Sequence, residues 1–273
     1  MLFLSLATLV SLSGCSGRDK DTADTDMDTD TNTTDTDTDT NTGMGGFTLS
    51  GVAVDLSTGA AADGTGLTVA VADPTPALAG GEMDMLATGT INADGTFTVP
   101  GVVTTSTVGL FVVITGTGVM NSASGVAATS YTGLGDGDTL SGATAYVVTD
   151  ALSAGVNGSI SAVGGSHDIV TEGVLFGFVL DSTGAPVAGA TAGCAGCGTP
   201  DFYYADAVSA DGLFSSSTGI NTTTDPAARS MFVVPGAPIA SYFADDGGVH
   251  DFPSQLGGSL PAFAAFIAIN ATN

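Results

Sequence analysis

Two histidines, each followed by an aspartate, are the first residues in this sequence that could do chemistry. They are His167, before Asp168, and His250, before Asp251, and the chain has no other histidine. A histidine oriented by a carboxylate can activate a serine hydroxyl for nucleophilic attack. The sequence has no Gly-x-Ser-x-Gly turn that would present such a serine, and neither histidine has the ligand spacing of a zinc site. We therefore predict no catalytic residues.

The motif Cys194-Ala-Gly-Cys197 is the second candidate. In an exported protein, two cysteines this close are most simply bridged to each other, and we predict a local disulfide that stiffens a glycine-rich loop. A redox-active Cys-x-x-Cys usually lies at a helix N-terminus, where the dipole lowers a thiol pKa. Gly193 before the motif and Gly198 after it do not favour a helix. Redox chemistry and half of a metal site stay as alternatives.

Two carboxylates, Asp136 and Asp138, form the third candidate. They lie in the stretch GLGDGDTL, which resembles one copy of a calcium-binding nonapeptide repeat. In such repeats the ion is shared between stacked turns, and a single copy has no neighbour to share it with. We interpret the stretch as a flexible acidic turn before a strand, with calcium as the one cofactor that the sequence suggests.

Composition limits the possible partners. The chain of 273 residues has 3 Lys and Arg against 28 Asp and Glu, a formal net charge of -25. Such a surface repels phosphate backbones and anionic lipid headgroups, so we exclude nucleic-acid binding. Only 11% of residues are charged, 40 are glycine and none is tryptophan, which favours short strands joined by many turns.

The N-terminal segment indicates export and lipid anchoring. Residues 1–14 form an apolar run that ends in small residues, as signal peptides do. The run Leu-Ser-Gly before Cys15 resembles the lipobox of bacterial lipoproteins. The resemblance implies cleavage before Cys15, acylation of its sulfur and a membrane partner through the lipid. Ser16, rather than aspartate, follows the cysteine, which by the sorting habit of Gram-negative lipoproteins implies the outer membrane.

Residues 15–45 continue from this cysteine as a spacer. From Asp19 to Thr42 the chain is almost entirely aspartate and threonine, with Ala23 and Met27 as its apolar residues. A segment with nothing to bury and with repelling charges is expected to stay extended and disordered. We predict that it holds the folded part away from the membrane; calcium binding by its aspartates is the alternative.

The rest of the chain has the patterns of an all-β protein. An apolar strand over 174–179 leads into Asp181-Ser-Thr-Gly184, which predicts a hairpin whose returning segment points Val187 and Ala190 to one side. A strand over 108–114, apolar on both faces, is expected to be central. Residues 150–155 fit a short helix capped by Asp150, and 157–168 are glycine-rich enough for a linker. The aromatic residues at 202–204 fit core packing, and Arg229 is expected to pair with a local carboxylate.

The strand and turn patterns occur twice. Leu-Ser-Gly51 and Ser-Thr-Gly59 return as Leu-Phe-Gly177 and Ser-Thr-Gly184, and Ala-Asp-Gly-Thr-Phe97 returns as Ala-Asp-Gly-Leu-Phe214. The repeat predicts a duplicated module, with a first β-sandwich over 46–165 and a second over 172–273. A strand, an Asp-Ser-Thr-Gly turn, Ala-Pro-Val-Ala-Gly-Ala-Thr and a later Asp-Gly-x-Phe strand together resemble the carboxypeptidase regulatory-like domain. The resemblance implies tandem immunoglobulin-like or transthyretin-like β-sandwiches in a binding or supporting role, without catalytic residues.

These observations favour a non-catalytic, lipid-anchored protein of the cell envelope that displays β-sandwich modules for binding, adhesion or envelope structure. An envelope protein or a glycan is the expected partner. The alternative from another class is a secreted, calcium-dependent module that binds carbohydrate or protein. An enzyme that uses one of the histidines ranks third.

Overall fold

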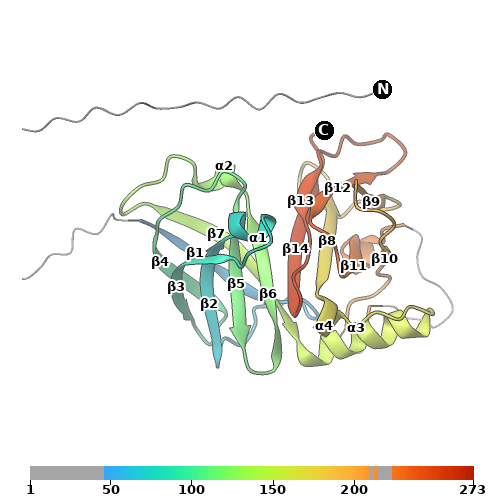
Figure 1. The fold of residues 1–273 in the computed structure, drawn as a ribbon, viewed down its shortest axis with the longest axis horizontal. Helices are drawn as coiled ribbons and strands as arrows, with labels where there is room; N and C mark the ends of the chain where they lie inside the picture. The colour runs from blue at the N-terminus through green and yellow to red at the C-terminus, as the bar shows by residue number, and fades with distance from the viewer. Residues whose placement is uncertain (1–45, 210–211, 214–222) are drawn as a thin grey trace, which may run out of the picture. The chain divides into compact units, whose positions relative to one another are not determined.

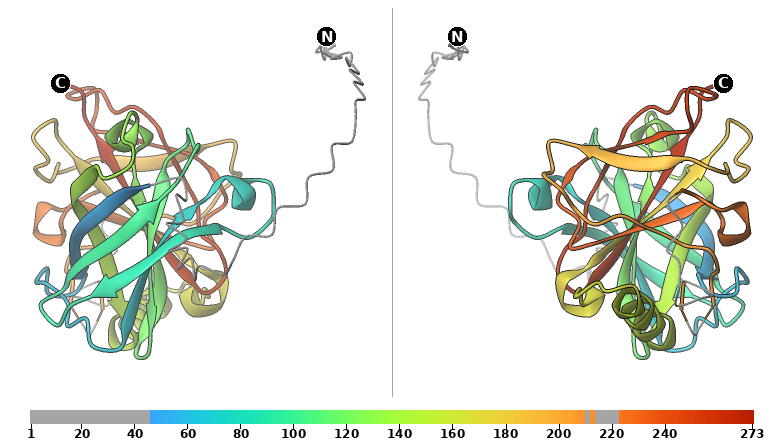
Figure 2. Two further views of the ribbon diagram at one scale, coloured as in Figure 1. Left: turned by 90° about the vertical axis from the view of Figure 1, so that its left-hand side faces the viewer. Right: turned by 90° about the vertical axis from the view of Figure 1, so that its right-hand side faces the viewer.

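Fourteen β-strands run through the part of the chain that the computed structural model describes, residues 46–209, 212–213 and 223–273 (Figures 1 and 2). We call β1 to β7 the N-terminal half and α3 to β14 the C-terminal half. The N-terminal half comprises β1 (Phe47–Asp55), β2 (Leu67–Asp73), α1 (Thr75–Leu78), β3 (Asp84–Ile91), β4 (Thr96–Val102), β5 (Leu110–Gly116), β6 (Val119–Val126), α2 (Ala128–Tyr131) and β7 (Thr139–Thr149). The C-terminal half comprises α3 (Asp150–Ala162), α4 (Ile169–Glu172), β8 (Val174–Leu180), β9 (Thr191–Ala195), β10 (Tyr203–Tyr204), the short 3-10 helix η1 (Pro226–Ala228), β11 (Met231–Pro235), β12 (Ala240–Asp245), β13 (Gln255–Gly257) and β14 (Phe263–Asn270).

The seven strands of the N-terminal half form an unbroken ring of hydrogen-bonded neighbours. The order around the ring is β1, β4, β3, β2, β5, β6 and β7, which pairs with β1 again. Successive side chains of a strand point to opposite faces, so each strand supplies every second residue to the inside. Leu49, Phe97 and Ile114 are at most 1% exposed there and belong to one apolar core. The strand predicted over 108–114 is β5, which lies between β2 and β6 as expected.

The C-terminal half is a sandwich with a helix on its outer face. One sheet has the order β10, β11, β8 and β14, and the other has the order β13, β12 and β9. Phe232 of the first sheet and Tyr242 of the second are fully buried in the core between them. On the other face of the first sheet, Val156 and Ile160 of α3 pack with Phe176. Because both faces of β8 are covered, six of its seven residues are buried, which explains its nearly continuous apolar sequence.

The two halves share one sheet through β6 and β14. Strand β14 pairs in parallel with β8 along its length and with β6 from Phe263↔Asn121 to Phe266↔Ser124. Strand β6 also pairs with β7 at its first two residues. Farther along, buried serines replace that ladder: the Ser122 hydroxyl donates to the Tyr146 carbonyl at 2.6 Å, and Ser124 Oγ accepts from the Tyr146 N–H at 2.9 Å. Strand β6 is therefore a branch point between the ring and the sandwich.

The prediction of a mostly β protein is confirmed, but two tandem domains are not. The predicted modules, 46–165 and 172–273, contribute strands to the same sheet, and their side chains mix in one core. Leu56 and Val148 from the first segment pack there with Phe176 and Met231 from the second. The long-range pairing of β14 with β6 makes the two segments one structure, although their turn sequences are repeated.

The predicted linker is wrong, because residues 157–162 belong to a helix. Helix α3 spans Asp150–Ala162, and its N-cap is Thr149, whose side chain accepts a hydrogen bond from the Leu152 N–H. The predicted helix was thus too short, and Asp150 lies in its first turn rather than at the cap. Figure 1 shows α3 beneath the ends of β8 and β14. Leu152, Val156 and Ile160 recur at helical spacing and face the core, which outweighs the low helix propensity of the glycines.

The repeat is confirmed for the Asp55 and Asp181 turns, whereas the second copy of the other repeated turn, Ala-Asp-Gly-Leu-Phe214, lies largely outside the described residues. Asp55 Oδ1 accepts hydrogen bonds from the N–H and hydroxyl of Ser57, and Asp181 Oδ1 accepts the same pair from Thr183. These hydrogen bonds lower the pKa of Asp181. Gly184 completes its turn at a φ of 85°, which favours glycine. The hairpin itself is shorter than predicted, since the returning chain makes one bridge to β8, at Pro186, and then enters the second sheet as β9.

The predicted signal peptide, Cys15 and the Asp/Thr spacer lie outside the described residues. Within the described part, no helix has the length and apolar character needed to cross a membrane.

Candidate functional site

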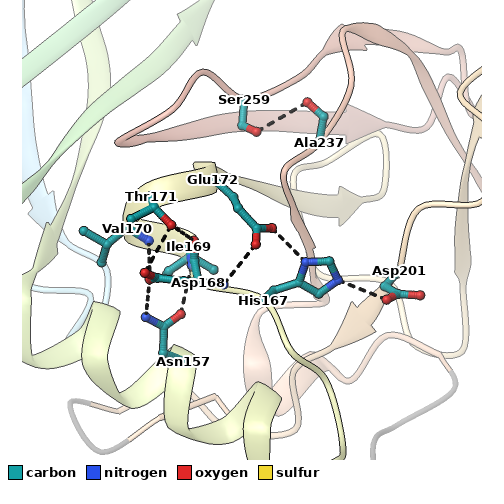
Figure 3. Close-up of polar contacts among 10 residues, drawn as sticks. All are labelled: Asn157, His167, Asp168, Ile169, Val170, Thr171, Glu172, Asp201, Ala237 and Ser259. Atoms are coloured by element: carbon teal, nitrogen blue, oxygen red, sulfur yellow. Dashed lines mark hydrogen bonds and ion pairs between the residues drawn. The ribbon is translucent and has the colours of Figure 1, made fainter.

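Two carboxylates surround His167, in the connection between α3 and β8 (Figure 3). His167 Nδ1 lies 2.8 Å from Glu172 Oε2, and Nε2 lies 3.0 Å from Asp201 Oδ2. Glu172 is the last residue of α4, whereas Asp201 precedes β10, thirty-four positions along the chain from the histidine. We call these three residues the His167 cluster.

Local capping holds the His167 cluster in place. Asp168 is the N-cap of α4, and its Oδ1 accepts hydrogen bonds from the Val170 N–H at 3.1 Å and from Asn157 Nδ2 at 2.9 Å. Asn157 Oδ1 in turn accepts from the Ile169 N–H at 2.9 Å, so one asparagine of α3 anchors the start of α4. The His167 ring also meets the Tyr203 ring edge-on, with centroids 6.4 Å apart.

In the His167 cluster both ring nitrogens of the histidine face carboxylate oxygens. Hydrogen bonds to Glu172 first, and to Asp201 second, raise the pKa of His167, and partial burial opposes them more weakly. When the ring is protonated, both nitrogens can donate to these carboxylates, and the three side chains then form an ion-pair clamp. The geometry thus joins α4 to the segment before β10. His167 does not pair with its sequence neighbour Asp168, because the Asp168 carboxylate accepts hydrogen bonds from Asn157 of α3 and from the Val170 N–H of α4.

His250 is held in a similar way. Its Nδ1 lies 2.5 Å from Asp246 Oδ2, and Asp246 Oδ1 accepts from the backbone N–H groups of Val249 and His250. Burial of the Asp246 carboxyl acts to raise its pKa, but the hydrogen bonds from His250 and the backbone outweigh it and lower the pKa. Asp251, the sequence neighbour, instead donates its N–H to Asn273 Oδ1. Among the described residues, no serine hydroxyl is hydrogen-bonded to either histidine.

Cys194 and Cys197 are joined in a disulfide, with their Cα atoms 5.9 Å apart. Cys194 lies in β9, opposite Tyr242 of β12, and the bridge closes the loop that leaves this edge strand. The motif therefore starts in a strand and not at the helix N-terminus that a reactive thiol uses. Gly196 and Gly198 turn the loop with φ values of 78° and 73°.

The Asp136 and Asp138 stretch forms a turn between α2 and β7. Asp138 Oδ2 accepts from the Gly135 N–H at 2.8 Å, and the Asp138 carbonyl accepts from the Thr48 N–H at 2.8 Å. Over the described ranges, no three His, Cys, Asp or Glu residues come together as a metal site would need. Calcium binding stays a prediction.

Two further predictions concern the aromatic run before and in β10 and the single basic residue Arg229. Tyr203 and Tyr204 are buried on opposite faces of their sheet, as predicted for core packing. The Tyr204 hydroxyl accepts from the Ala192 N–H at 2.7 Å. Arg229 makes no ion pair among the described residues, contrary to expectation; its guanidinium lies against Gly59, where an added Cβ would sit 2.6 Å from Nη2.

Comparisons with known proteins show no family. No family model matches the chain, and no curated protein matches it. Among solved structures, the shaft pilin SpaA of Lactobacillus rhamnosus GG matches at 11% identity and a TM-score of 0.22, over 84% of this chain and 98% of the pilin. A streptococcal ancillary pilin matches at 12% and 0.24, over 82% and 68%. The Bacillus anthracis TIE protein matches at 8% and 0.21, over 83% and 34%. At such TM-scores these likenesses do not establish a shared fold or function.

Proposed function

We propose that this chain is a non-catalytic protein of the cell envelope, anchored by lipid at Cys15, whose β-rich body serves binding, adhesion or envelope structure. The observation that supports this most is the state of the two histidines. His167 and His250, the only ones in the chain, are both engaged by carboxylates of the fold, in positions that join segments of backbone. The groups best suited to acid–base chemistry at neutral pH thus stabilise the structure.

The anchor is proposed from the sequence. The Leu-Ser-Gly-Cys15 run resembles a lipobox, and Ser16 fits sorting to the outer membrane. The Asp/Thr tract would place the folded body at a distance from the membrane, because its charges repel one another. The body is acidic too, with Arg229 as its sole Lys or Arg, so it would also be held off an anionic lipid surface. In this proposal the repeated strand and turn sequences derive from an ancestral duplication of one β-sandwich module.

Metabolic labelling with a clickable fatty acid tests the anchor. Cells that express the full chain should incorporate the label into it, and Cys15→Ser should abolish the incorporation. The double variant Cys194→Ser with Cys197→Ser is the matched control, since it also removes thiols but leaves the proposed lipidation site. Label that persists in Cys15→Ser, or that never appears, would refute the anchor.

The absence of catalysis is tested separately. A hydrolase screen of the purified chain should give no turnover that depends on His167 or His250. Turnover that the His167→Gln or His250→Gln variant abolishes, while the circular dichroism spectrum stays unchanged, would replace the proposal with an enzyme.

A further inference from the structure

Strand β14 has a fully paired edge and a partly open one. Its pairing with β8 extends to Asn270↔Leu180, whereas its pairing with β6 ends at Phe266↔Ser124. Four residues of β14, 267–270, therefore continue beyond the ladder with β6. Figure 1 shows β14 with β8 on one side and β6 on the other, as the pairing requires.

The backbone direction of these four residues follows from two contacts. The Ala271 N–H donates to the Leu180 carbonyl at 2.8 Å, so position 271 faces β8. The Phe266 carbonyl oxygen lies 3.5 Å from the position of a Cβ added to Gly125, so position 266 faces β6. Because backbone groups alternate along a strand, Ala268 and Asn270 direct their N–H and C=O toward the β6 side, past the end of its ladder. A strand edge with this geometry can accept another chain.

An apolar groove lies along the same edge. It has a volume of about 340 Å³ and is lined on one side by Ile267, Ala268 and Asn270, with Val126 of β6 on the other. Its rim contains large apolar side chains that are unusually exposed, which are Leu78 (38%), Val108 (45%), Ile239 (43%) and Leu256 (45%). Apolar side chains gathered at a groove are typical of a surface that binds a partner.

The charge around the groove limits what that partner is. Exposed Glu82 and Asp84 flank Met83 of the lining in the sequence, and Asp73, whose Oδ1 accepts hydrogen bonds from Thr75 and Ser106, precedes Pro74. Arg229 is the sole Lys or Arg of residues 46–273, and its guanidinium lies beside Gly59. A second copy of this chain would meet the rim with like charge. The chain's own Asp/Thr tract is acidic as well, and has almost no apolar side chains to bury.

We propose that this groove binds an extended segment of a basic partner protein, which adds to the open edge of β14 as a parallel or antiparallel strand. Main-chain hydrogen bonds to Ala268 and Asn270 would hold the guest segment, and alternate apolar side chains would enter the groove. Lys or Arg residues on either side of the apolar stretch would meet Asp73, Glu82 and Asp84. This rests on the proposed function only in assigning the protein a binding role.

Fluorescence anisotropy with the peptide KKVTVTVKK tests the proposal. The peptide alternates valine with threonine between lysine pairs, and the protein is the full chain with Cys15→Ser, so the result does not depend on lipidation. We expect saturable binding in the micromolar range. Replacing the lysines by glutamate, or the central valine by proline, should each weaken it by about tenfold or more, through repulsion or a lost backbone donor. Absence of saturable binding by KKVTVTVKK would refute the proposal.

Variants of the protein test whether the peptide binds in this groove. Val108→Ser should weaken binding several-fold by making the rim polar, whereas Val249→Ser, at an exposed valine outside the groove lining, should not. Ala268→Pro should weaken binding about tenfold, because it removes the open-edge N–H while keeping the donors that face β8. Thermal melts check that each variant is folded. Binding that is unchanged in folded Val108→Ser, or lost equally in Val249→Ser, would contradict the assignment.

Discussion

The N-terminal half closes its sheet on itself, whereas the C-terminal half leaves strand edges that other parts of the chain must secure. Each strand of the ring has a neighbour on both sides. In the sandwich, β9, β10 and β13 each end a sheet. The disulfide and the three ion pairs of the two histidines occur in the C-terminal half, next to these ends.

The difference indicates how each half obtains its stability. A closed sheet satisfies its backbone groups within itself, and its turns need only local aspartate caps such as the one that Asp94 gives to Thr96. Short edge strands bury less apolar surface and pair on one side only. A cross-link that fixes the adjoining loop therefore contributes more to holding such a strand in place. The His167 cluster and the disulfide bound the same connection, from Cys194 in β9 to Asp201 before β10. The disulfide and the His167 cluster thus lie in the connection between two strands that each end a sheet.

The largest expected effect tests whether the halves unfold together. Phe97→Ala in the ring and Phe176→Ala in the sandwich each remove a ring that is at most 1% exposed, and each should cost about 3–5 kcal/mol. Because β14 pairs with β6, we expect either variant to lower hydrogen-exchange protection in both halves. If Phe97→Ala leaves the amides of β8 and β11 fully protected, the halves are separable domains, as the sequence repeat predicts.

A smaller effect is expected at the junction itself. Ser122→Ala would leave the carbonyl of half-buried Tyr146 without its hydroxyl donor, at a cost of about 1–3 kcal/mol in the free energy of unfolding. Ser141→Ala is the matched control, since Ser141 is exposed in β7. Urea denaturation followed by circular dichroism measures both. Equal stability of the two variants would show that the hydroxyl bridge does not hold β6 to β7.

The disulfide should contribute less than a long-range bridge. Its cysteines are 3 positions apart, and the chain-entropy relation gives about 2 kcal/mol for so small a ring. Cys194→Ser with Cys197→Ser should therefore lower the melting temperature modestly. Hydrogen exchange should increase at β9 and β12 and stay unchanged in β2 and β5. Loss of protection throughout the ring would contradict a local role.

Local features were predictable from the sequence, and long-range ones were not. The Asp181 turn and the apolar run of β5 depend on residues a few positions apart, whose chemistry specifies them directly. The pairing of Phe263 with Asn121 joins two strands that lie far apart in the sequence, and no local pattern specifies it. That pairing is the reason why two predicted domains share one sheet.

In the candidate site, too, local contacts were easier to predict than long-range ones. Adjacent residues suggested His167 with Asp168, but neighbours in a chain often point apart, and the real partners are Glu172 and Asp201. Glu172 follows within one short helix and could have been considered. Asp201 reaches His167 only through the crossing of the chain between the two sheets. Ser122 and Ser124 alternate as a solvent-facing strand would, yet their hydroxyls are buried at the branch point.

The smallest effect concerns the pH dependence of the His167 clamp. The pKa of His167 is raised in the folded protein, so its stabilisation is complete below the unfolded value of about 6.5 and is lost as the pH rises through the folded value. His167→Gln should therefore be less stable than the parent chain at pH 5.5, by up to about 1 kcal/mol for a partly exposed ion pair, and nearly equal at pH 9. Glu172→Gln should remove most of the same dependence, because Glu172 is the main cause of the shift. Urea midpoints measured across this range check the sign, and a parent chain that gains stability over His167→Gln as the pH rises would show that the histidine is held neutral.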